Sequence, residues 1–243
     1  MRTSAADRLF RLVLVPSFFG VVSMFVARLS AAESTATSIA APAAGLGQFA
    51  HATDVGKITL TGSSEFLAGS GHYRITGSGA NIWGKEDAFH FLWREHSGDL
   101  SFTIDATWPG AGREAHRKVC AMARAGLESD AAYVDVAIHG DGLIELQYRK
   151  EKGGNTFGVR TPITAPATVK LERDGDVFTV SVARKGGSFQ PVGSLSLPLP
   201  DPLCVGLAVS AHNATVRETA LISNIALTNR VAQPAEKRVR ETR

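Results

Sequence analysis

The sequence predicts an all-β fold, a two-sheet antiparallel sandwich of the jelly-roll type. Most segments between residues 89 and 227 alternate apolar and polar side chains with a period of two, which is typical of strands with one buried face. Gly, Pro, Asp and Asn separate these segments at short intervals, as in proteins built from many short strands. The chain contains no internal repeat and no heptad pattern, so it favours neither a solenoid nor a coiled coil.

The alternating segments follow one another along the chain, and each has an apolar phase that we expect to face the core. These phases are Phe89, Phe91 and Trp93; Leu100, Phe102, Ile104, Ala106 and Trp108; Val169 and Leu171; Phe178, Val180 and Val182; and Val205, Leu207, Val209 and Ala211. A final segment, 220–227, closes the set. Residues 111–124 also fit a helix, but 117–124 fits a strand better beside its neighbours.

A hairpin is predicted over residues 133–149, where two alternating runs flank a Gly-Asp-Gly turn. The two apolar sets share a face only if Ile138 lies opposite Ile144, which leaves 140–142 as the loop. Such a loop ends on a left-handed residue, and Gly142 supplies one.

The same register sets polar side chains against one another on the second face of the hairpin. Tyr133 lies beside Arg149, and Asp135 beside Gln147. We expect this face to be open, and it serves either as a solvated surface or as a binding surface for something polar.

The two ends of the chain differ from its middle. Arginines at positions 2, 8 and 11 precede an apolar run with small residues after it, which predicts a secretory signal cleaved near Ala32. The predicted organisation is a signal peptide (1–32), a flexible lead-in (33–50), one sandwich domain (51–229) and a disordered basic tail (230–243). We therefore expect an exported protein, periplasmic or extracellular, without a stable membrane span after cleavage.

The formal charge argues against nucleic acid as a partner. The chain carries +3, but residues 1–32 contribute +3 and residues 230–243 contribute another +3. The predicted body, 33–229, is then about −3, whereas nucleic-acid binding requires a basic footprint.

Cys120 and Cys204 are the two cysteines, and each lies in a predicted strand. In an exported protein they either form a disulfide between neighbouring strands or remain two half-buried thiols. Neither belongs to a CxxC pair.

Sequence motifs for common catalytic and cofactor sites are missing. The chain has no Walker loop, GxGxxG, GxSxG, HExxH or EF-hand motif, so we expect no cofactor. Glycosidases need two carboxyl groups flanking the scissile bond, and Asp135 and Glu145 are the weak catalytic candidates here. They lie on neighbouring predicted strands and lack the Glu-x-Asp-x-Glu pattern of sandwich glucanases.

Histidines offer a second chemistry. His90, His116, His139 and His212 fall at polar phases or strand ends, and converging imidazoles can bind zinc. None shows the local spacing of metal ligands, so hydrogen bonding across strands explains them equally well and no metal is assigned.

Trp83 follows the sequence GSGANI outside any alternating phase, so we expect it in a loop or at a strand end. An exposed indole there is a platform for the apolar face of a sugar ring, and filling the core is the alternative role.

Several of these motifs together resemble one family. GSGANIW (77–83), DAFHF (87–91), HRK (116–118), YVDVAIHGDGLIELQYR (133–149), LERDGD (171–176), VGLAVSAHN (205–213) and SN (223–224) carry the likeness. They resemble an uncharacterised bacterial branch of the concanavalin-A-like lectin/glucanase superfamily, related to domains fused to TolB-like propellers and to the C-terminal domains of xylosidases. The resemblance covers about residues 57–228 and implies a jelly roll whose concave sheet often receives a saccharide.

The sequence leads to three functional hypotheses. The first is an exported domain that binds a carbohydrate or another polar polymer without cleaving it, on a concave face. The expected ligand-binding residues are Trp83, His90, Arg124, Tyr133, Asp135, His139, Gln147, Arg149 and His212. The second is a glycan hydrolase that uses Asp135 and Glu145 or a histidine-bound metal. The third is an accessory module that contacts a partner protein.

Overall fold

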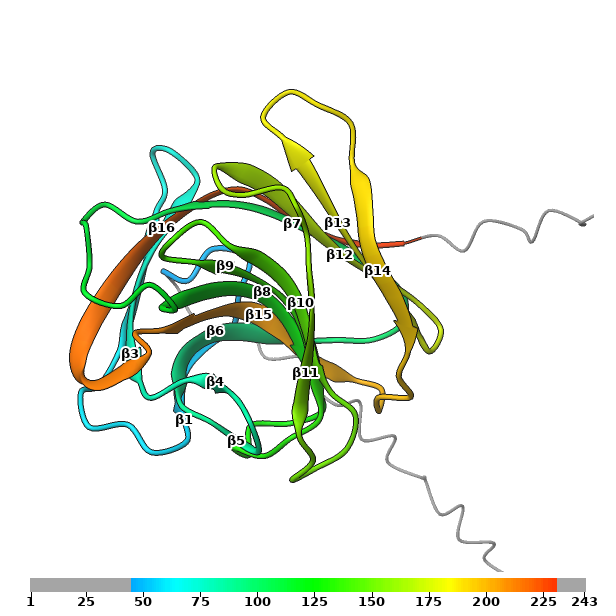
Figure 1. Cartoon of the computed structure of the whole chain (residues 1–243), viewed down its shortest axis with the longest axis horizontal. Coiled ribbons are helices and arrows are strands. Elements are labelled where there is room, and N and C mark those ends of the chain that lie inside the picture. The colour runs from blue at the N-terminus through cyan, green and yellow to red at the C-terminus, as the bar shows by residue number, and fades with distance from the viewer. Residues whose placement is uncertain (1–44, 231–243) are drawn as a thin grey trace, which may run out of the picture. The chain divides into compact units, whose positions relative to one another are not determined.

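The computed structural model describes residues 45–230, and within them it is all-β, which confirms the predicted fold class. Two antiparallel sheets of seven strands form the two layers of a sandwich, and a short hairpin lies beside the first (Figure 1). The expected signal peptide, most of the lead-in and the tail after Arg230 lie outside the described residues. No helix within this range is long and apolar enough to cross a membrane.

Sheet A contains the predicted 133–149 hairpin. Its strands, in spatial order, are β1 (His51–Val55), β6 (Phe89–His96), β15 (Leu203–Ser210), β8 (Lys118–Arg124), β9 (Tyr133–His139), β10 (Ile144–Arg149) and β11 (Thr156–Arg160).

Sheet B forms the second layer. Its strands, in spatial order, are β14 (Gln190–Ser196), β13 (Val177–Arg184), β12 (Ala167–Asp174), β7 (Leu100–Thr107), β16 (Asn213–Asn229), β3 (His72–Gly79) and β2 (Ser63–Leu67). A separate hairpin pairs β4 (Ile82–Trp83) with β5 (Glu86–Asp87).

The hairpin of β9 and β10 has the predicted register. Ile138 lies opposite Ile144, and Gly142 adopts the left-handed conformation with a φ of 90°. The Asp141 side chain accepts a hydrogen bond from the Leu143 amide at 3.0 Å, which closes the loop. Local sequence is sufficient here because turn chemistry and apolar alternation select the same register.

The main core lies between the sheets. Val134, Val136 and Ile138 of β9 face Ile104, Val169 and other apolar side chains of sheet B. The alternation along β6 is opposite to the one expected: Leu92 belongs to this core, whereas Phe89, Phe91 and Trp93 form a second apolar cluster.

This second cluster covers part of the outer face of sheet A, by which we mean the face turned away from sheet B. Besides the three aromatic residues of β6 it includes Ile82, Cys120, Met122 and Tyr133. Every residue of β9 is buried, so the expectation of one buried and one open face is wrong for this strand. A strand covered on both faces still alternates when one of its buried faces is polar.

The structure also bears on the start of the domain and on the two cysteines. Phe49 is buried in the main core, so residues just before His51 pack against the sandwich. Of the two alternatives for Cys120 and Cys204 the structure has the free thiols, which lie on neighbouring strands. Cys120 pairs with Ala208, four residues from Cys204 along β15, an offset of about 13 Å that no disulfide spans.

Candidate functional site

A pocket of about 280 Å³ opens on the outer face of sheet A. Its walls come from β8, β9, β10 and β11, from the segment that includes β4, and from three connecting loops. The lining residues are Asn81, Trp83, His116, Lys118, His139, Leu143, Glu145, Gln147, Arg160 and His212. Nine of the ten carry a polar group or an indole, so the pocket suits a polar ligand with an apolar face.

Trp83 lies at the end of β4 with 39% of its surface exposed, among the more exposed large apolar side chains of the described residues. The hairpin of β4 and β5 places it over the sheet rather than in the core. Lys118 Nζ lies 5.4 Å from the centre of the indole ring, a cation–π contact that orients one face of the ring.

Lys118 begins β8 and is buried, with 3% of its surface exposed. Its Nζ donates hydrogen bonds to Asn81 Oδ1 at 2.9 Å and to the Ile82 carbonyl at 2.8 Å. Both acceptors are neutral. Burial lowers the pKa of Lys118, and the negative charges of nearby acidic groups oppose that shift.

Three histidines meet at one side of the pocket. The ring of His116 lies 5.7 Å from that of His139 and 5.6 Å from that of His212, edge to face in both pairs. Burial, followed by the charge of Lys118, lowers the pKa of His139 to about 4. Its Nδ1 lies 3.1 Å from the Leu143 carbonyl, which only accepts, so Nδ1 carries the proton and Nε2 is free to accept a hydrogen bond.

His212 stands in the turn between β15 and β16 with a φ of 55°, in the left-handed region. Burial lowers its pKa, and its buried Nδ1 has no hydrogen-bond partner among the described residues. Neutral imidazoles of this kind can donate to and accept from hydroxyl groups. The residues from 45 to 230 contain no group of three His, Cys, Asp or Glu side chains arranged to hold a metal ion.

Glu145 is the acidic residue of the pocket. Its Oε2 accepts a hydrogen bond from Gln147 Nε2 at 2.7 Å, and its Oε1 lies 3.5 Å from Arg160 Nε. Its charge is therefore largely shared with protein groups.

Asp135 lies behind the pocket lining, opposite Gln147 in the pair of β9 and β10. The side chain is fully buried, and neither carboxyl oxygen has a hydrogen-bond partner among the described residues. Burial raises its pKa to about 8, with the charge of Lys118 acting in the opposite direction. Since Glu145 lines the pocket and Asp135 does not, the two carboxyl groups do not flank a shared cleft.

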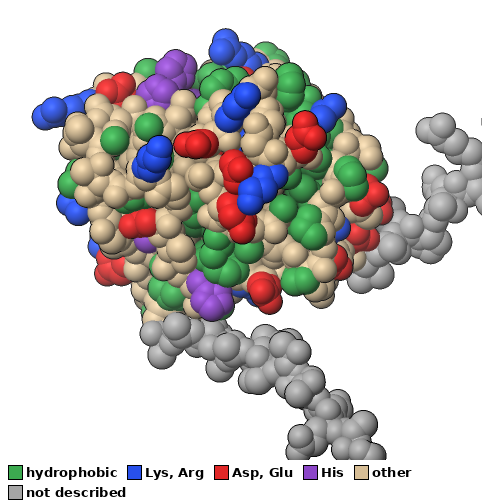
Figure 2. Space-filling view, turned by 90° about the horizontal axis from the view of Figure 1, so that it is seen from below, with side chains coloured by type: hydrophobic (Ala, Val, Ile, Leu, Met, Phe, Trp, Pro, Cys, Tyr) green, Lys and Arg blue, Asp and Glu red, His purple; other side chains and the backbone are tan. Residues whose placement is uncertain are grey.

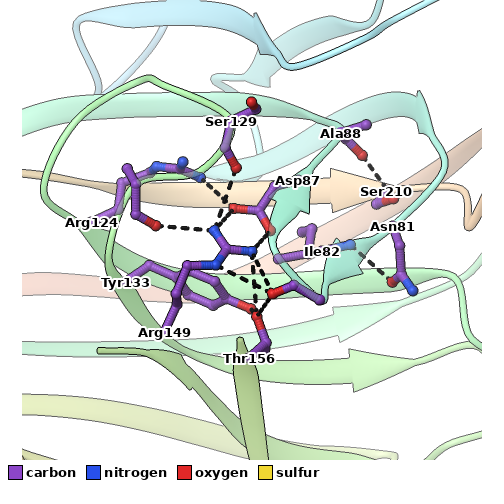
Figure 3. Close-up of polar contacts among 12 residues, drawn as sticks. Asn81, Ile82, Asp87, Ala88, Arg124, Ser129, Tyr133, Arg149, Thr156 and Ser210 are labelled. Atoms are coloured by element: carbon purple, nitrogen blue, oxygen red, sulfur yellow. Dashed lines mark hydrogen bonds and ion pairs between the residues drawn. The ribbon is translucent and has the colours of Figure 1, made fainter. Parts of the chain in front are cut away.

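Arg124 and Arg149 belong to a buried ion cluster beside the pocket (Figure 3). Arg149 donates to both oxygens of Asp87, at 2.8 and 2.7 Å, and to the Ala131 carbonyl at 3.0 Å. Arg124 Nη1 lies 3.5 Å from Asp87 Oδ2, and Arg124 Nε donates to the Gly126 carbonyl. The two guanidinium groups thus hold the β4–β5 hairpin and the loop 125–132 against sheet A.

Tyr133 also belongs to this cluster. The Arg149 guanidinium lies 5.0 Å from the centre of its ring, and its hydroxyl is 3.3 Å from Thr156 Oγ1. Every polar group of the side chain is occupied by the protein.

His90 projects from the opposite face of β6, toward sheet B. Its Nδ1 lies 2.7 Å from Asp54 Oδ1, and its Nε2 lies 3.0 Å from Ser64 Oγ. This position results from the reversed phase of β6.

The structure therefore divides the expected binding residues into two groups. Trp83, His139, Gln147 and His212 line one pocket. His90, Arg124, Tyr133, Asp135 and Arg149 are buried away from it, and the expectation that they are exposed for binding is wrong. In each case except Asp135 a protein partner takes the place that a ligand was expected to have.

Sequence reasoning missed Lys118, Arg160 and Asn81 as pocket residues, and treated His116 as a metal candidate alone. Lys118 has the same strand phase as Arg124, and that signal could have found it. Arg160 and Asn81 could not have been found locally, because β11 and the turn before β4 reach the pocket through tertiary packing.

No family model and no curated protein matches the sequence. Solved structures do match. A protein of unknown function from Saccharomyces cerevisiae is 15% identical, with a TM-score of 0.57 over 77% of this chain and 100% of that one. The GH43 protein BlXynB from Bacillus licheniformis is 9% identical, with a TM-score of 0.50 over 73% of this chain and 37% of that one, so this chain spans little more than a third of its length. The carbohydrate binding module CBM66 from Bacillus subtilis is 15% identical, with a TM-score of 0.47 over 74% and 96%.

These identities establish the fold alone. The protein is a two-sheet antiparallel jelly-roll sandwich. Because this architecture hosts different functions, the ligand and the activity depend on the residues of the pocket.

Proposed function

We propose that the pocket on the outer face of sheet A binds a saccharide, and that Trp83 is its stacking platform. The observation that carries the proposal is an indole with 39% of its surface exposed at a pocket lined by hydrogen-bonding side chains. A sugar ring presents an apolar face of C–H groups and a rim of hydroxyls. Trp83 matches the first, and the pocket's amide, imidazole and carboxylate groups match the second.

The pocket groups complement one another as hydroxyl partners. Gln147 and Glu145 are already aligned by their mutual hydrogen bond, and His139 presents a free acceptor. Side chains fixed by protein contacts lose little conformational freedom when a ligand binds, which favours affinity. Catalysis by an acid–base pair is not part of the proposal, because Asp135 does not reach the pocket.

Export to a periplasmic or extracellular compartment remains a prediction of the N-terminal sequence, and it fits contact with polysaccharides. On the face drawn in Figure 2, acidic and basic side chains are interspersed rather than gathered by sign. That face therefore offers no extended basic stripe of the kind that nucleic acid needs.

The test is a glycan-array screen followed by calorimetry, with Trp83→Ala beside the unmodified protein. We expect Trp83→Ala to weaken binding of the selected glycan about tenfold or more, because a central aromatic anchor is lost.

Phe189→Ala is the matched control. Phe189 is equally exposed, at 40%, and also lies under a lysine, with Lys170 Nζ 4.6 Å from its ring centre, but it does not line the pocket. Equal binding by Trp83→Ala and the unmodified protein, or no glycan binding by the folded protein, contradicts the proposal.

A further inference from the structure

Resting on the proposed function, we infer that the saccharide is acidic, and that Lys118 recognises a carboxylate or sulfate group on it. The inference comes from the position, burial and hydrogen bonding of one ammonium group in the pocket.

Lys118 is a buried cation without an anionic partner. No carboxylate oxygen of the described residues lies within the ion-pair distance of 4.0 Å from Lys118 Nζ. Both of its hydrogen bonds go to neutral oxygens, those of Asn81 and Ile82. Since buried charges are normally paired, an ammonium group lining an open pocket indicates that the missing anion comes with the ligand.

Hydrogen-bond capacity leads to the same conclusion. An ammonium group has three N–H donors, and protein acceptors occupy two of them. The third N–H is available to the pocket that Lys118 lines. Charge-assisted hydrogen bonds to an oxyanion are about twice as strong as neutral ones, so an acidic group is the preferred acceptor.

The other charges of the pocket leave it positive. Arg160 is a second cation in the lining and is 72% exposed, while Glu145 is the acidic group between Arg160 and Gln147. Asp135 is fully buried behind the lining, and burial raises its pKa, which favours the neutral carboxyl. The pocket is thus positive on a body, residues 33–229, whose formal charge is about −3.

The position of the ammonium suits a substituent on a stacked sugar. Nζ lies 5.4 Å from the centre of the Trp83 ring, so a sugar in contact with the exposed part of the indole brings its substituents close to Lys118. Neutral His139 and Gln147 remain for the hydroxyls. In this arrangement Trp83 supplies affinity for the ring, and Lys118 supplies selectivity for the acid.

A purely structural role for Lys118 is the competing explanation, because its hydrogen bonds also attach the start of β4 to the sheet. Asn81→Asp separates the two explanations. The change is nearly isosteric, keeps an oxygen 2.9 Å from Nζ and keeps the acceptor for the Ile82 amide, but it gives Lys118 an internal anion. The structural contact is retained, while the demand for an external anion is removed.

The experiment measures binding of matched acidic and neutral probes by calorimetry. The probes are tetramers of galacturonate, mannuronate and guluronate, the methyl esters of the same tetramers, and sulfated galactose oligomers. The proteins are the unmodified chain, Lys118→Met, Asn81→Asp, and Lys170→Met as the control lysine over an exposed ring.

We expect the unmodified protein and Lys170→Met to bind an acidic tetramer about tenfold or more tighter than its ester. Lys118→Met and Asn81→Asp should each remove that preference. Binding of the sulfated oligomers alone, with the same dependence on Lys118, supports the inference with a sulfate ester as the anion.

Equal binding of acid and ester, or a preference that survives in Asn81→Asp and Lys118→Met, overturns the inference. Trp83-dependent binding of neutral glycans without any preference for acid overturns it and leaves the proposed function standing. Absence of Trp83-dependent binding to every glycan contradicts both.

Discussion

Asp135 shows how a single side chain can be misread when strand phase is the main information. Its alternation with Val134 and Val136 correctly places it on the second face of β9, opposite Gln147. That face is covered, and the carboxyl is fully buried without a hydrogen-bond partner among the described residues. A binding role requires exposure, whereas burial with a raised pKa makes Asp135 a group that limits stability.

We expect the free energy of unfolding to fall as the pH rises from about 4 to about 8, and Asp135→Asn to flatten this dependence. Burial raises the pKa of the folded state to about 8 from the ordinary value of 3.8, so between these values the folded protein binds a proton that the unfolded chain has released. One such proton costs up to about 1.4 kcal/mol of stability per pH unit.

Urea denaturation at pH 5 and pH 8 measures how the free energy of unfolding changes with pH in Asp135→Asn and in the unmodified protein. The control is Asp174→Asn, which changes an exposed carboxyl on sheet B and should leave the pH dependence of the unmodified protein intact. Identical slopes in Asp135→Asn and the unmodified protein would show that Asp135 does not carry the proton.

At the scale of elements, the β4–β5 hairpin supplies Trp83 to the wall of the pocket. It is two residues per strand and does not belong to either large sheet, so its own hydrogen bonds are too few to hold it. Asp87, at its end, is attached to sheet A through Arg149 and Arg124 (Figure 3). This attachment also fixes Trp83, which lies opposite Glu86 in the same hairpin.

Replacing Asp87 with Ala should lower the free energy of unfolding by about 3–5 kcal/mol, because two buried guanidinium groups lose their carboxylate. Glycan binding should weaken as well, since Trp83 loses its support. Urea denaturation and calorimetry measure the two effects.

The control is Glu65→Ala, which removes an exposed pair with Arg74 and should cost less than about 1 kcal/mol. If Asp87→Ala costs no more than Glu65→Ala, the ion cluster does not hold the hairpin.

At the scale of the whole molecule, the two layers are held by apolar packing rather than by covalent links. One core of buried residues lies between the sheets, and a smaller cluster covers part of the outer face of sheet A. Within the described residues, which contain both cysteines of the chain, no disulfide joins the strands. The stability of these layers therefore depends on the burial of apolar surface.

We expect the midpoint of urea denaturation to be the same with and without dithiothreitol. Burial raises the pKa of Cys204 to about 11 and raises that of Cys120, so both thiols stay protonated and unreactive in the folded state. Thiol titration should find little reaction before unfolding and both thiols after it. A midpoint that shifts with the reductant would indicate a disulfide and contradict this account.

The sequence predicted those features that depend on residues close together along the chain. The loop at Gly142 and the register of Ile138 opposite Ile144 depend on neighbours along the chain, and both are confirmed. Which phase of a strand faces the main core is not fixed locally, and along β6 it is the reverse of the one expected. The all-β sandwich follows from the same local signals because many short amphipathic strands have few ways to bury their apolar faces.

The sequence by itself determined the class of fold, the hairpin and a polar second face on β9 and β10. Tertiary structure alone decided what covers that face. Arg124 and Arg149 bind Asp87 in a distant hairpin, while Lys118, in the same strand phase as Arg124, has neutral partners and lines a pocket. Alternation specifies the direction of a side chain but not its partners, because those come from elements far away in the sequence. Burial and charge pairing, which distinguish a structural arginine from a pocket-lining lysine without an anionic partner, are therefore properties of the assembled fold.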